Sequence, residues 1–313
     1  MDWTQLMFWS AALATALFVL IRGADIFITG ARNCGASLGM SPFAIGVFIV
    51  GFGTSLPELA SSVAGALSGS TEIVIANVVG SNITNILLIV GVMALLAGRV
   101  VIKQELLMTE LPLFVIAQMF LVIVIIDGVV EQTEAGFLII LFTAYVWYVL
   151  SGTKNNSMIG DERPNFRWRD VLWVVLGLAA VLVGAAYTVE MAVNIATAVA
   201  VPIGLVSITA IAIGTSLPEL FVTLQAVRSR HTEMAMGNIF GSNTFNALIV
   251  TGIPGLLVPL AVDTVVLELG LWFMIAASIM IFVIGLSRQV MRSEGFMMLI
   301  FFVFFMYKLA AFI

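Results

Sequence analysis

The heptapeptide Gly-Thr-Ser-Leu-Pro-Glu-Leu occurs twice in this chain, at residues 53–59 and again at residues 214–220. Each copy lies in the middle of an apolar stretch, so each places a glutamate, Glu58 or Glu219, inside a segment suited to span a membrane. A carboxylate near the centre of a bilayer costs at least ~2.5 kcal/mol on insertion scales, and such a residue is a functional-site hypothesis by default. The duplicated motif therefore predicts a repeat in the fold and a site built around two carboxylates.

The composition places the chain in a membrane. Of its 313 residues, 61% are hydrophobic and 10% are charged, and the mean hydropathy is +1.15, whereas soluble domains carry about 25% charged residues. The first apolar run lacks a basic n-region and a cleavage site, so we interpret it as a retained helix. Segments of about 20 apolar residues span a bilayer, and we expect ten of them, at roughly 7–34, 40–67, 72–97, 105–126, 133–151, 170–197, 203–227, 233–259, 265–286 and 295–312.

A single offset of 161 residues relates the two halves of the chain. Adding 161 to the residue number takes Glu58 to Glu219 and Asn85 to Asn246. The same offset relates pairs of glycines, prolines and serines in the two halves. Each half contains five expected spans, an odd number, so the second half enters the membrane in the opposite sense, as in many secondary transporters. We predict an all-α integral membrane protein with ten transmembrane helices in two inverted five-helix repeats, residues 1–151 and 170–313, joined by a linker loop at residues 152–169.

The basic residues predict the orientation. With the N-terminus outside, 11 of the 13 lysines and arginines fall on the cytoplasmic side, and the opposite loops carry acidic residues. An excess of basic residues marks cytoplasmic loops. We therefore expect a multi-pass protein of the cell (inner) membrane with both termini outside and the linker in the cytoplasm.

The first motif combines a helix breaker with oxygen ligands. Pro57 and Pro218 each lack an N–H group, so the helix should break at each motif, and a broken backbone at membrane depth is tolerated where it lines a cavity or binds an ion. The neighbouring hydroxyls and carboxylate are hard oxygen ligands that suit Ca²⁺ or Na⁺. Cys34 and His231 are the only cysteine and histidine of the chain, so no cluster of soft or imidazole ligands can form.

A second duplicated motif supplies a polar helix face. Its members are spaced four residues apart and share one face of a helix: Asn77, Ser81 and Asn85, repeated as Asn238, Ser242 and Asn246. We expect this face to turn toward the glutamate motif of the preceding helix. Polar residues in membrane helices often only form hydrogen bonds between helices. Two glutamates brought together, however, would repel each other unless a cation or protons lay between them. The glutamates therefore favour an ion site.

These paired segments, GTSLPE and GSNxxN, resemble the two alpha-repeats of the Ca²⁺:cation antiporter superfamily, most closely its prokaryotic sodium/calcium exchanger branch. The resemblance covers essentially the whole chain. It implies no cofactor besides the transported ions, and ion ligands at Glu58, Glu219, Thr54, Ser55, Thr215, Ser216, Ser81, Ser242, Asn85 and Asn246, together with the backbone carbonyls of Gly51 and Ala212.

One feature departs from the pattern. Several relatives carry an aspartate at one of the two positions that Asn85 and Asn246 occupy, whereas this chain has asparagine at both. Two fixed carboxylates then balance the charge of one Ca²⁺ or two Na⁺, and the absence of an aspartate weakens any case for K⁺ co-transport.

The resemblance implies a secondary active antiporter that exchanges Na⁺ for Ca²⁺ across the membrane by alternating access, working as a monomer, with the glycine-bearing first and sixth helices sliding past a fixed core. H⁺/Ca²⁺ or other cation exchange on the same scaffold, a cation channel and a non-transporting scaffold stay open as alternatives. No nucleophile–base set, phosphate loop or redox motif predicts an enzyme. The 18 acidic residues outnumber the 13 basic ones, which argues against nucleic-acid binding.

Overall fold

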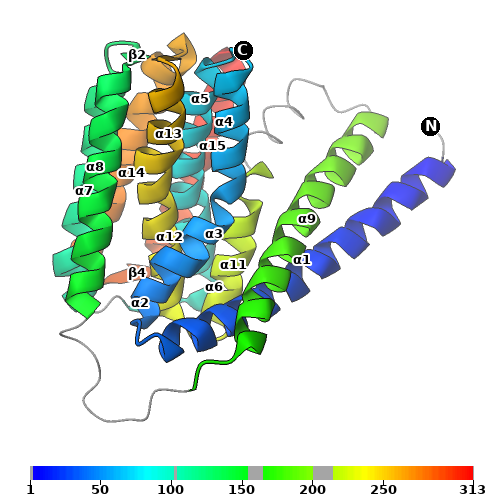
Figure 1. Cartoon of the computed structure of the whole chain (residues 1–313). Coiled ribbons are helices and arrows are strands. Elements are labelled where there is room, and N and C mark those ends of the chain that lie inside the picture. The colour runs from blue at the N-terminus through cyan, green and yellow to red at the C-terminus, as the bar shows by residue number, and fades with distance from the viewer. Residues whose placement is uncertain (1–2, 102–103, 154–164, 200–213, 313) are drawn as a thin grey trace.

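The computed structural model describes residues 3–101, 104–153, 165–199 and 214–312, and most of them are helical (Figure 1). Short π-helical segments, labelled η, interrupt several of the helices. The elements are α1 (Trp3–Ser37), α2 (Pro42–Ile45), η1 (Gly46–Gly51), α3 (Phe52–Thr54), α4 (Leu56–Leu67), α5 (Glu72–Ile83), η2 (Thr84–Ile89), α6 (Val90–Ala97), β1 (Arg99–Val101), α7 (Gln104–Ile125), β2 (Val129–Val130), α8 (Gln132–Thr153), α9 (Trp168–Ala198), α11 (Leu217–Arg228), α12 (Thr232–Phe245), η3 (Asn246–Val250), α13 (Thr251–Leu257), β3 (Leu260–Ala261), η4 (Val266–Gly270), α14 (Leu271–Leu286), β4 (Gln289–Met291) and α15 (Arg292–Phe312).

The expected spans correspond to helices or to runs of consecutive helices. The seventh, 203–227, is described only from Gly214 onward. Within the described ranges, six helices are long and apolar enough to cross a membrane, and a bent pair from Pro42 to Leu67 would make a seventh. The number ten therefore stays a prediction. Four strands of two or three residues are an addition to the predicted all-helical fold.

These strands pair according to the repeat. β1 pairs antiparallel with β4, and β2 pairs antiparallel with β3. The 161-residue offset carries Arg99 of β1 to Leu260 of β3, and Val129 of β2 to Val290 of β4. The first strand of each half therefore pairs with the second strand of the other half. Two halves related by a two-fold axis would pair in this way.

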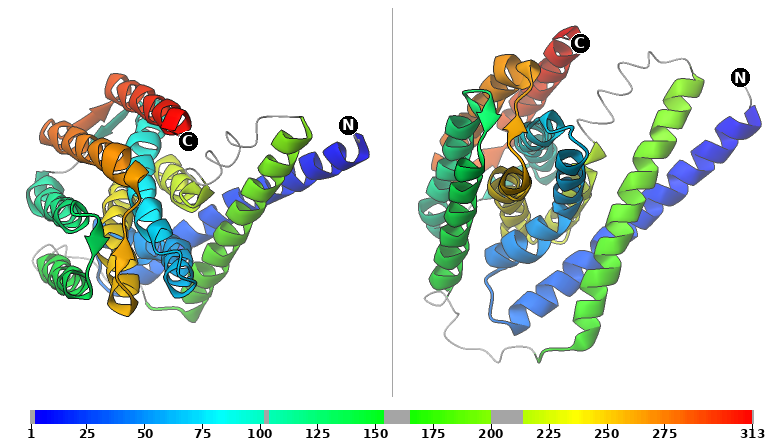
Figure 2. Two further views of the ribbon diagram at one scale, coloured as in Figure 1. Left: turned by 90° about the horizontal axis from the view of Figure 1, so that it is seen from above. Right: turned by 45° about the horizontal axis from the view of Figure 1, so that its top comes forward.

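The two long helices α1 and α9 lie side by side, apart from most of the remaining bundle (Figures 1 and 2). A Cβ atom added to Gly23 would lie 2.8 Å from the Val181 nitrogen, and one added to Gly184 would lie 2.8 Å from the Leu20 nitrogen. Both distances are too short for a side chain, so the helices cross backbone to backbone, as small residues allow in membranes. Residues later in α1 contact residues earlier in α9, so the two helices run antiparallel.

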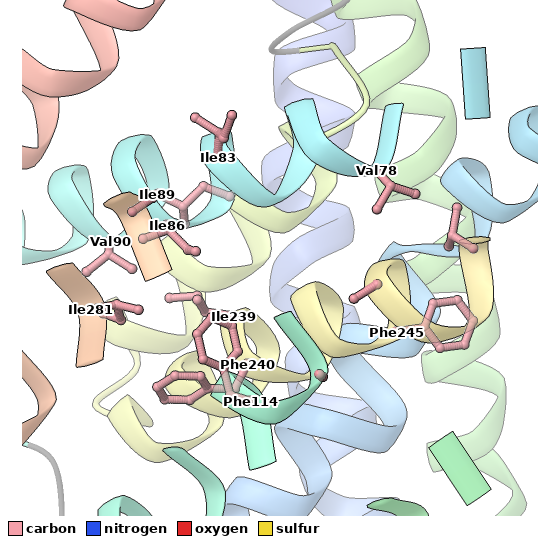
Figure 3. Packing of buried hydrophobic residues seen from close by; sticks show 14 of the residues in the cluster. Val78, Ile83, Ile86, Ile89, Val90, Phe114, Ile239, Phe240, Phe245 and Ile281 are labelled. Atoms are coloured by element: carbon pink, nitrogen blue, oxygen red, sulfur yellow. The ribbon is translucent and has the colours of Figure 1, made fainter. Parts of the chain in front are cut away.

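The helix α12 and its continuation η3 lie at the centre of the bundle, where every residue from Met234 to Val250 is buried. On one side η1 packs directly on α12, because a Cβ added to Gly46 would overlap the Met234 carbonyl oxygen. On another side α7 packs on α12 through aromatic side chains. Figure 3 shows Phe114 of α7 beside Phe240 of α12, with ring centroids 5.2 Å apart. This apolar surround encloses the polar faces of α5 and α12.

Candidate functional site

The helix breaks at both glutamate motifs, as the prolines predict. The helical run Pro42–Thr54 bends by 42° into α4, with Ser55 at the junction at φ −87° and ψ 6°. In the second half, α11 begins after Ser216, whose φ of −86° and ψ of 3° are nearly the same. Glu58 and Glu219 consequently stand in the first turn of a helix, where the helix dipole favours a negative charge.

The two carboxylates lie at one buried site between the halves. Glu58 and Glu219 are each 1% exposed, and they interact electrostatically with each other. The Ser55 hydroxyl, from the first half, donates a hydrogen bond of 3.2 Å to Oε1 of Glu219, from the second half. The site is therefore shared between the two copies of the motif.

Four uncharged oxygens form a closed ring beside the carboxylates, and we call this set the oxygen ring. The Thr54 hydroxyl lies 3.3 Å from the Gly51 carbonyl and 3.4 Å from Oδ1 of Asn238. The Ser242 hydroxyl lies 3.2 Å from the same carbonyl and 3.5 Å from the same Oδ1. Oxygens that ligate a cation at 2.3–2.6 Å and at right angles stand roughly 3.3–3.7 Å apart, so the ring has the spacing of a cation site.

The Asn238 side chain is held so that its oxygen faces the ring. Its Nδ2 group donates to the Thr223 hydroxyl at 2.7 Å and to the backbone carbonyl of Glu219 at 3.3 Å. The expected turning of this polar face toward the preceding glutamate motif is confirmed by these contacts. The ligand position of Asn238 was not predicted, although its place on the polar face was the signal that could have found it.

The first half repeats part of this arrangement. Nδ2 of Asn77 donates to the Glu58 carbonyl at 3.3 Å, and the Ser81 hydroxyl lies 3.3 Å from the Thr215 hydroxyl. Ala212, whose carbonyl is the expected counterpart of the Gly51 carbonyl, lies outside the described residues. The structure thus brings Ser81 and Thr215 together. The counterpart of the oxygen ring in the other copy of the motif is described only in part.

Buried polar atoms without a partner concentrate at the predicted ligands. In the described part of the chain, twelve buried side-chain nitrogens and oxygens have no hydrogen-bond partner, and eight of them belong to Glu58, Glu219, Asn85, Asn246 and Ser216. A buried polar group left unpaired costs about 1–3 kcal/mol, so such groups need an explanation. A bound cation would supply one for the six oxygens among these eight atoms. No cluster of three or more acidic, histidine or cysteine residues occurs in the described ranges.

Three of the four π-helical segments in the described ranges, η1, η2 and η3, contain site residues. Gly51 ends η1, Asn85 lies in η2, and Asn246 begins η3. A π-bulge inserts one extra residue into an α-helix and frequently marks a functional site. Sequence periodicity did not predict these segments, because one added residue leaves the apolar pattern of a fully buried helix unchanged.

A basic contact joins the last part of α1 to the turn that precedes α12. The Arg32 Nη1 group lies 3.1 Å from Nε2 of His231. Partial burial, together with the Arg32 charge, lowers the pKa of His231 below its usual range. Because an arginine side chain can only donate, Nε2 of His231 accepts this hydrogen bond.

Comparison with known proteins agrees with this geometry. The model of the sodium/calcium exchanger protein family matches residues 8–151 and 170–310. The putative antiporter CaxA of Alkalimonas amylolytica and the sodium/calcium exchanger MaX1 of Methanosarcina acetivorans are each 32% identical to the chain, and each match covers 94% of this chain and 96% of the relative. A solved structure of the sodium-calcium exchanger NCX_Mj, soaked with zero Na⁺ and Ca²⁺, superposes with a TM-score of 0.83 at 26% identity, covering 97% of this chain and 99% of that one.

Proposed function

Because the chain belongs to the sodium/calcium exchanger protein family, we propose that it exchanges Na⁺ for Ca²⁺ across the membrane by alternating access. The family is one of transporters, and the fold of the chain is that of a membrane exchanger. The observation that carries the proposal is the buried pair Glu58 and Glu219 beside the oxygen ring, with both halves contributing ligands.

The two kinds of ligand suit the two ions. Two carboxylates neutralise one Ca²⁺, and Ca²⁺ accepts six to eight oxygen ligands in a flexible geometry. The oxygen ring carries no formal charge, which suits a monovalent cation beside the carboxylates. We assign ion-ligand roles to the residues of both motifs, namely Glu58, Glu219, Thr54, Ser55, Thr215, Ser216, Ser81, Ser242, Asn85, Asn246, Asn238 and the carbonyls of Gly51 and Ala212.

The proposal includes ten spans in two inverted halves, residues 1–151 and 170–313. Support comes from the strand pairs between the halves and from the antiparallel crossing of α1 and α9. The distribution of basic residues supports termini outside and a cytoplasmic linker at 152–169 in the inner membrane. Since one chain contributes both glutamates, a monomer contains a complete site.

Alternation is assigned to the pair formed by α1 and α9. These helices share a smooth glycine crossing and stand beside the bundle that holds the ligands (Figure 2). Two helices packed this closely, backbone against backbone, can shift along the bundle as one body. Such a shift would open the site to one side of the membrane at a time while the ligands on α5 and α12 stay in place.

The test uses purified protein in proteoliposomes. Vesicles loaded with Na⁺ should take up Ca²⁺ when the outside Na⁺ is diluted, and Glu58→Gln should abolish this uptake because a neutral amide cannot balance the ion. Glu72→Gln is the matched control, since Glu72 also lies in the first turn of a helix but is exposed. Full uptake by Glu58→Gln, or no gradient-driven uptake by the wild-type protein, would refute the proposal.

One observation favours proton coupling as a second candidate. Neither carboxylate oxygen of Glu58 has a hydrogen-bond partner in the described part of the chain, and a proton would neutralise such a buried group. Uptake of Ca²⁺ driven by a pH gradient without Na⁺ would identify an H⁺/Ca²⁺ exchanger. A cation channel would instead pass current in the absence of any counter-ion, and a non-transporting scaffold would tolerate alanine at both glutamates.

A further inference from the structure

A second buried polar cluster lies outside the predicted ligand set, where α5, α7 and α12 meet. Nδ2 of Asn82 donates to Oε1 of Gln118 at 3.0 Å. The backbone carbonyl of Asn243 accepts from both of these side chains, at 3.3 Å from Asn82 and at 3.2 Å from Gln118. Gln118 is 2% exposed, and both asparagines are fully buried. An amide loses its bonds to water in such a place, and here Gln118 uses both its donor and its acceptor.

The carbonyl that receives these bonds belongs to the turn that carries two ion ligands. Asn243 directly follows Ser242. Asn246 is the first residue of the π-helical segment η3, and its backbone N–H donates to the carbonyls of both Ser242 and Asn243. A side chain that inserts into the backbone ladder of a helix bends or widens it at that point. The side-chain amide of Gln118 therefore helps to fix the backbone turn that carries the Ser242 hydroxyl and the side-chain amide of Asn246.

The cluster acts on one half of the site only. Asn82 and Asn243 are equivalent under the 161-residue repeat, yet they bond differently. The Asn82 amide reaches across to the other half, whereas Nδ2 of Asn243 donates to the Ile239 carbonyl of its own helix at 2.7 Å. The turn that Gln118 supports is thus the one that places Ser242 in the oxygen ring, together with Gly51.

We propose that Gln118 is a positioning residue for Na⁺. By holding the Asn243 carbonyl it keeps the Ser242 hydroxyl in the oxygen ring, and so it sets the affinity for Na⁺ more than the affinity for Ca²⁺. The distinction arises because the oxygen ring is uncharged, while Glu58 and Glu219, which balance Ca²⁺, stand on two other helices, α4 and α11. The inference rests on the proposed exchange of these two ions at the site.

The variant Gln118→Met keeps the length and the apolar bulk of the side chain but removes both hydrogen-bonding groups. We expect the Na⁺ concentration for half-maximal exchange to rise about fivefold, which corresponds to about 1 kcal/mol. The Ca²⁺ concentration for half-maximal exchange should change less than about twofold, which is below 0.5 kcal/mol on the same scale. Gln118→Leu, which also removes both hydrogen-bonding groups and adds no charge, should shift Na⁺ in the same direction.

The control is Ser278→Ala. Ser278 lines the same pocket between α7 and α14 as Gln118, and its buried hydroxyl has no hydrogen-bond partner in the described ranges, so both half-maximal concentrations should stay at their wild-type values. A role confined to packing would predict that Gln118→Met lowers stability and leaves the Na⁺ dependence unchanged, and that result would overturn the proposal. If Gln118→Met does not fold, Gln118→Leu decides the matter by the same criteria.

A readout without transport separates this inference from the proposed function. Added Na⁺ raises the melting temperature of a protein whose folded state binds it, so the rise with Na⁺ can be compared between the wild-type protein and Gln118→Met in detergent. We expect a smaller rise for the variant and an equal rise with Ca²⁺. Wild-type protein that exchanges no ions would refute the proposed function, while equal Na⁺-dependent rises in both proteins would refute the role of Gln118.

Discussion

Replacing Asn238 by alanine tests the oxygen ring most directly. The change removes Oδ1, which lies 3.4 Å from the Thr54 hydroxyl and 3.5 Å from the Ser242 hydroxyl. It also removes the Nδ2 group, which donates to the Thr223 hydroxyl at 2.7 Å and to the Glu219 carbonyl at 3.3 Å. The substitution therefore deletes one proposed ligand and the two bonds that hold it.

The magnitudes follow from these contacts. Two donor hydrogen bonds at about 1 kcal/mol each lower the free energy of unfolding by about 2 kcal/mol. Loss of one ligand oxygen, at about 1.5 kcal/mol for a hydrogen bond or contact to a charged group, raises the half-maximal Na⁺ concentration roughly tenfold. Thermal unfolding in detergent measures the first effect, and Na⁺-dependent Ca²⁺ uptake into proteoliposomes measures the second.

Thr223→Val separates ligation from support. This nearly isosteric variant removes the acceptor at 2.7 Å and leaves Oδ1 of Asn238 in the ring. We expect its stability to fall by about 1 kcal/mol and its Na⁺ dependence to shift less than that of Asn238→Ala. The reasoning would be refuted if Asn238→Ala lowered the melting temperature while its Na⁺ dependence stayed that of the wild-type protein.

Two further outcomes are expected. Gly184→Val should slow exchange in protein that still folds, because its Cβ would lie 2.8 Å from the Leu20 nitrogen and force apart the pair of helices that is proposed to move as one body; an unchanged exchange rate would show that the close packing of α1 on α9 is not needed for exchange. Because the folded-state pKa of His231 lies below its usual value, the unfolded chain binds more protons below about pH 6.5, and stability falls as the pH is lowered through that range. His231→Gln should flatten this part of a plot of melting temperature against pH, and a plot that keeps the wild-type slope would contradict the assignment.

The parts of the structure that sequence could predict rest on local chemistry or on exact repetition. Proline predicted the breaks after Ser55 and Ser216, where the backbone angles of the two copies agree closely. The spacing of four residues predicted that Asn77 and Asn238 face the preceding glutamate motif. Both inferences need only one helix and its neighbour in the chain, so periodicity and a single offset were sufficient.

The features that escaped prediction depend on distant partners. Gln118 reads as a lone polar residue in an apolar stretch until α7 is placed against α12, because periodicity assigns a face without naming what covers it. The short strands carry too few residues for an alternating pattern to appear. Oδ1 of Asn238 joins the ring only because Thr54 comes from the opposite half.

The observed site is not symmetric between the two copies of the glutamate motif. The Ser55 hydroxyl donates to Glu219 at 3.2 Å, whereas the equivalent hydroxyl of Ser216 has no partner in the described part of the chain, and neither do the carboxylate oxygens of Glu58. The same motif stands in both halves, so we predict a counterpart state in which Ser216 donates to Glu58 and Ser55 releases Glu219. Because the halves are inverted in the proposed topology, that exchange of roles would reverse the side of the membrane to which the site opens. We therefore expect the asymmetry of a few hydrogen bonds around two glutamates to be the local form of the proposed alternation.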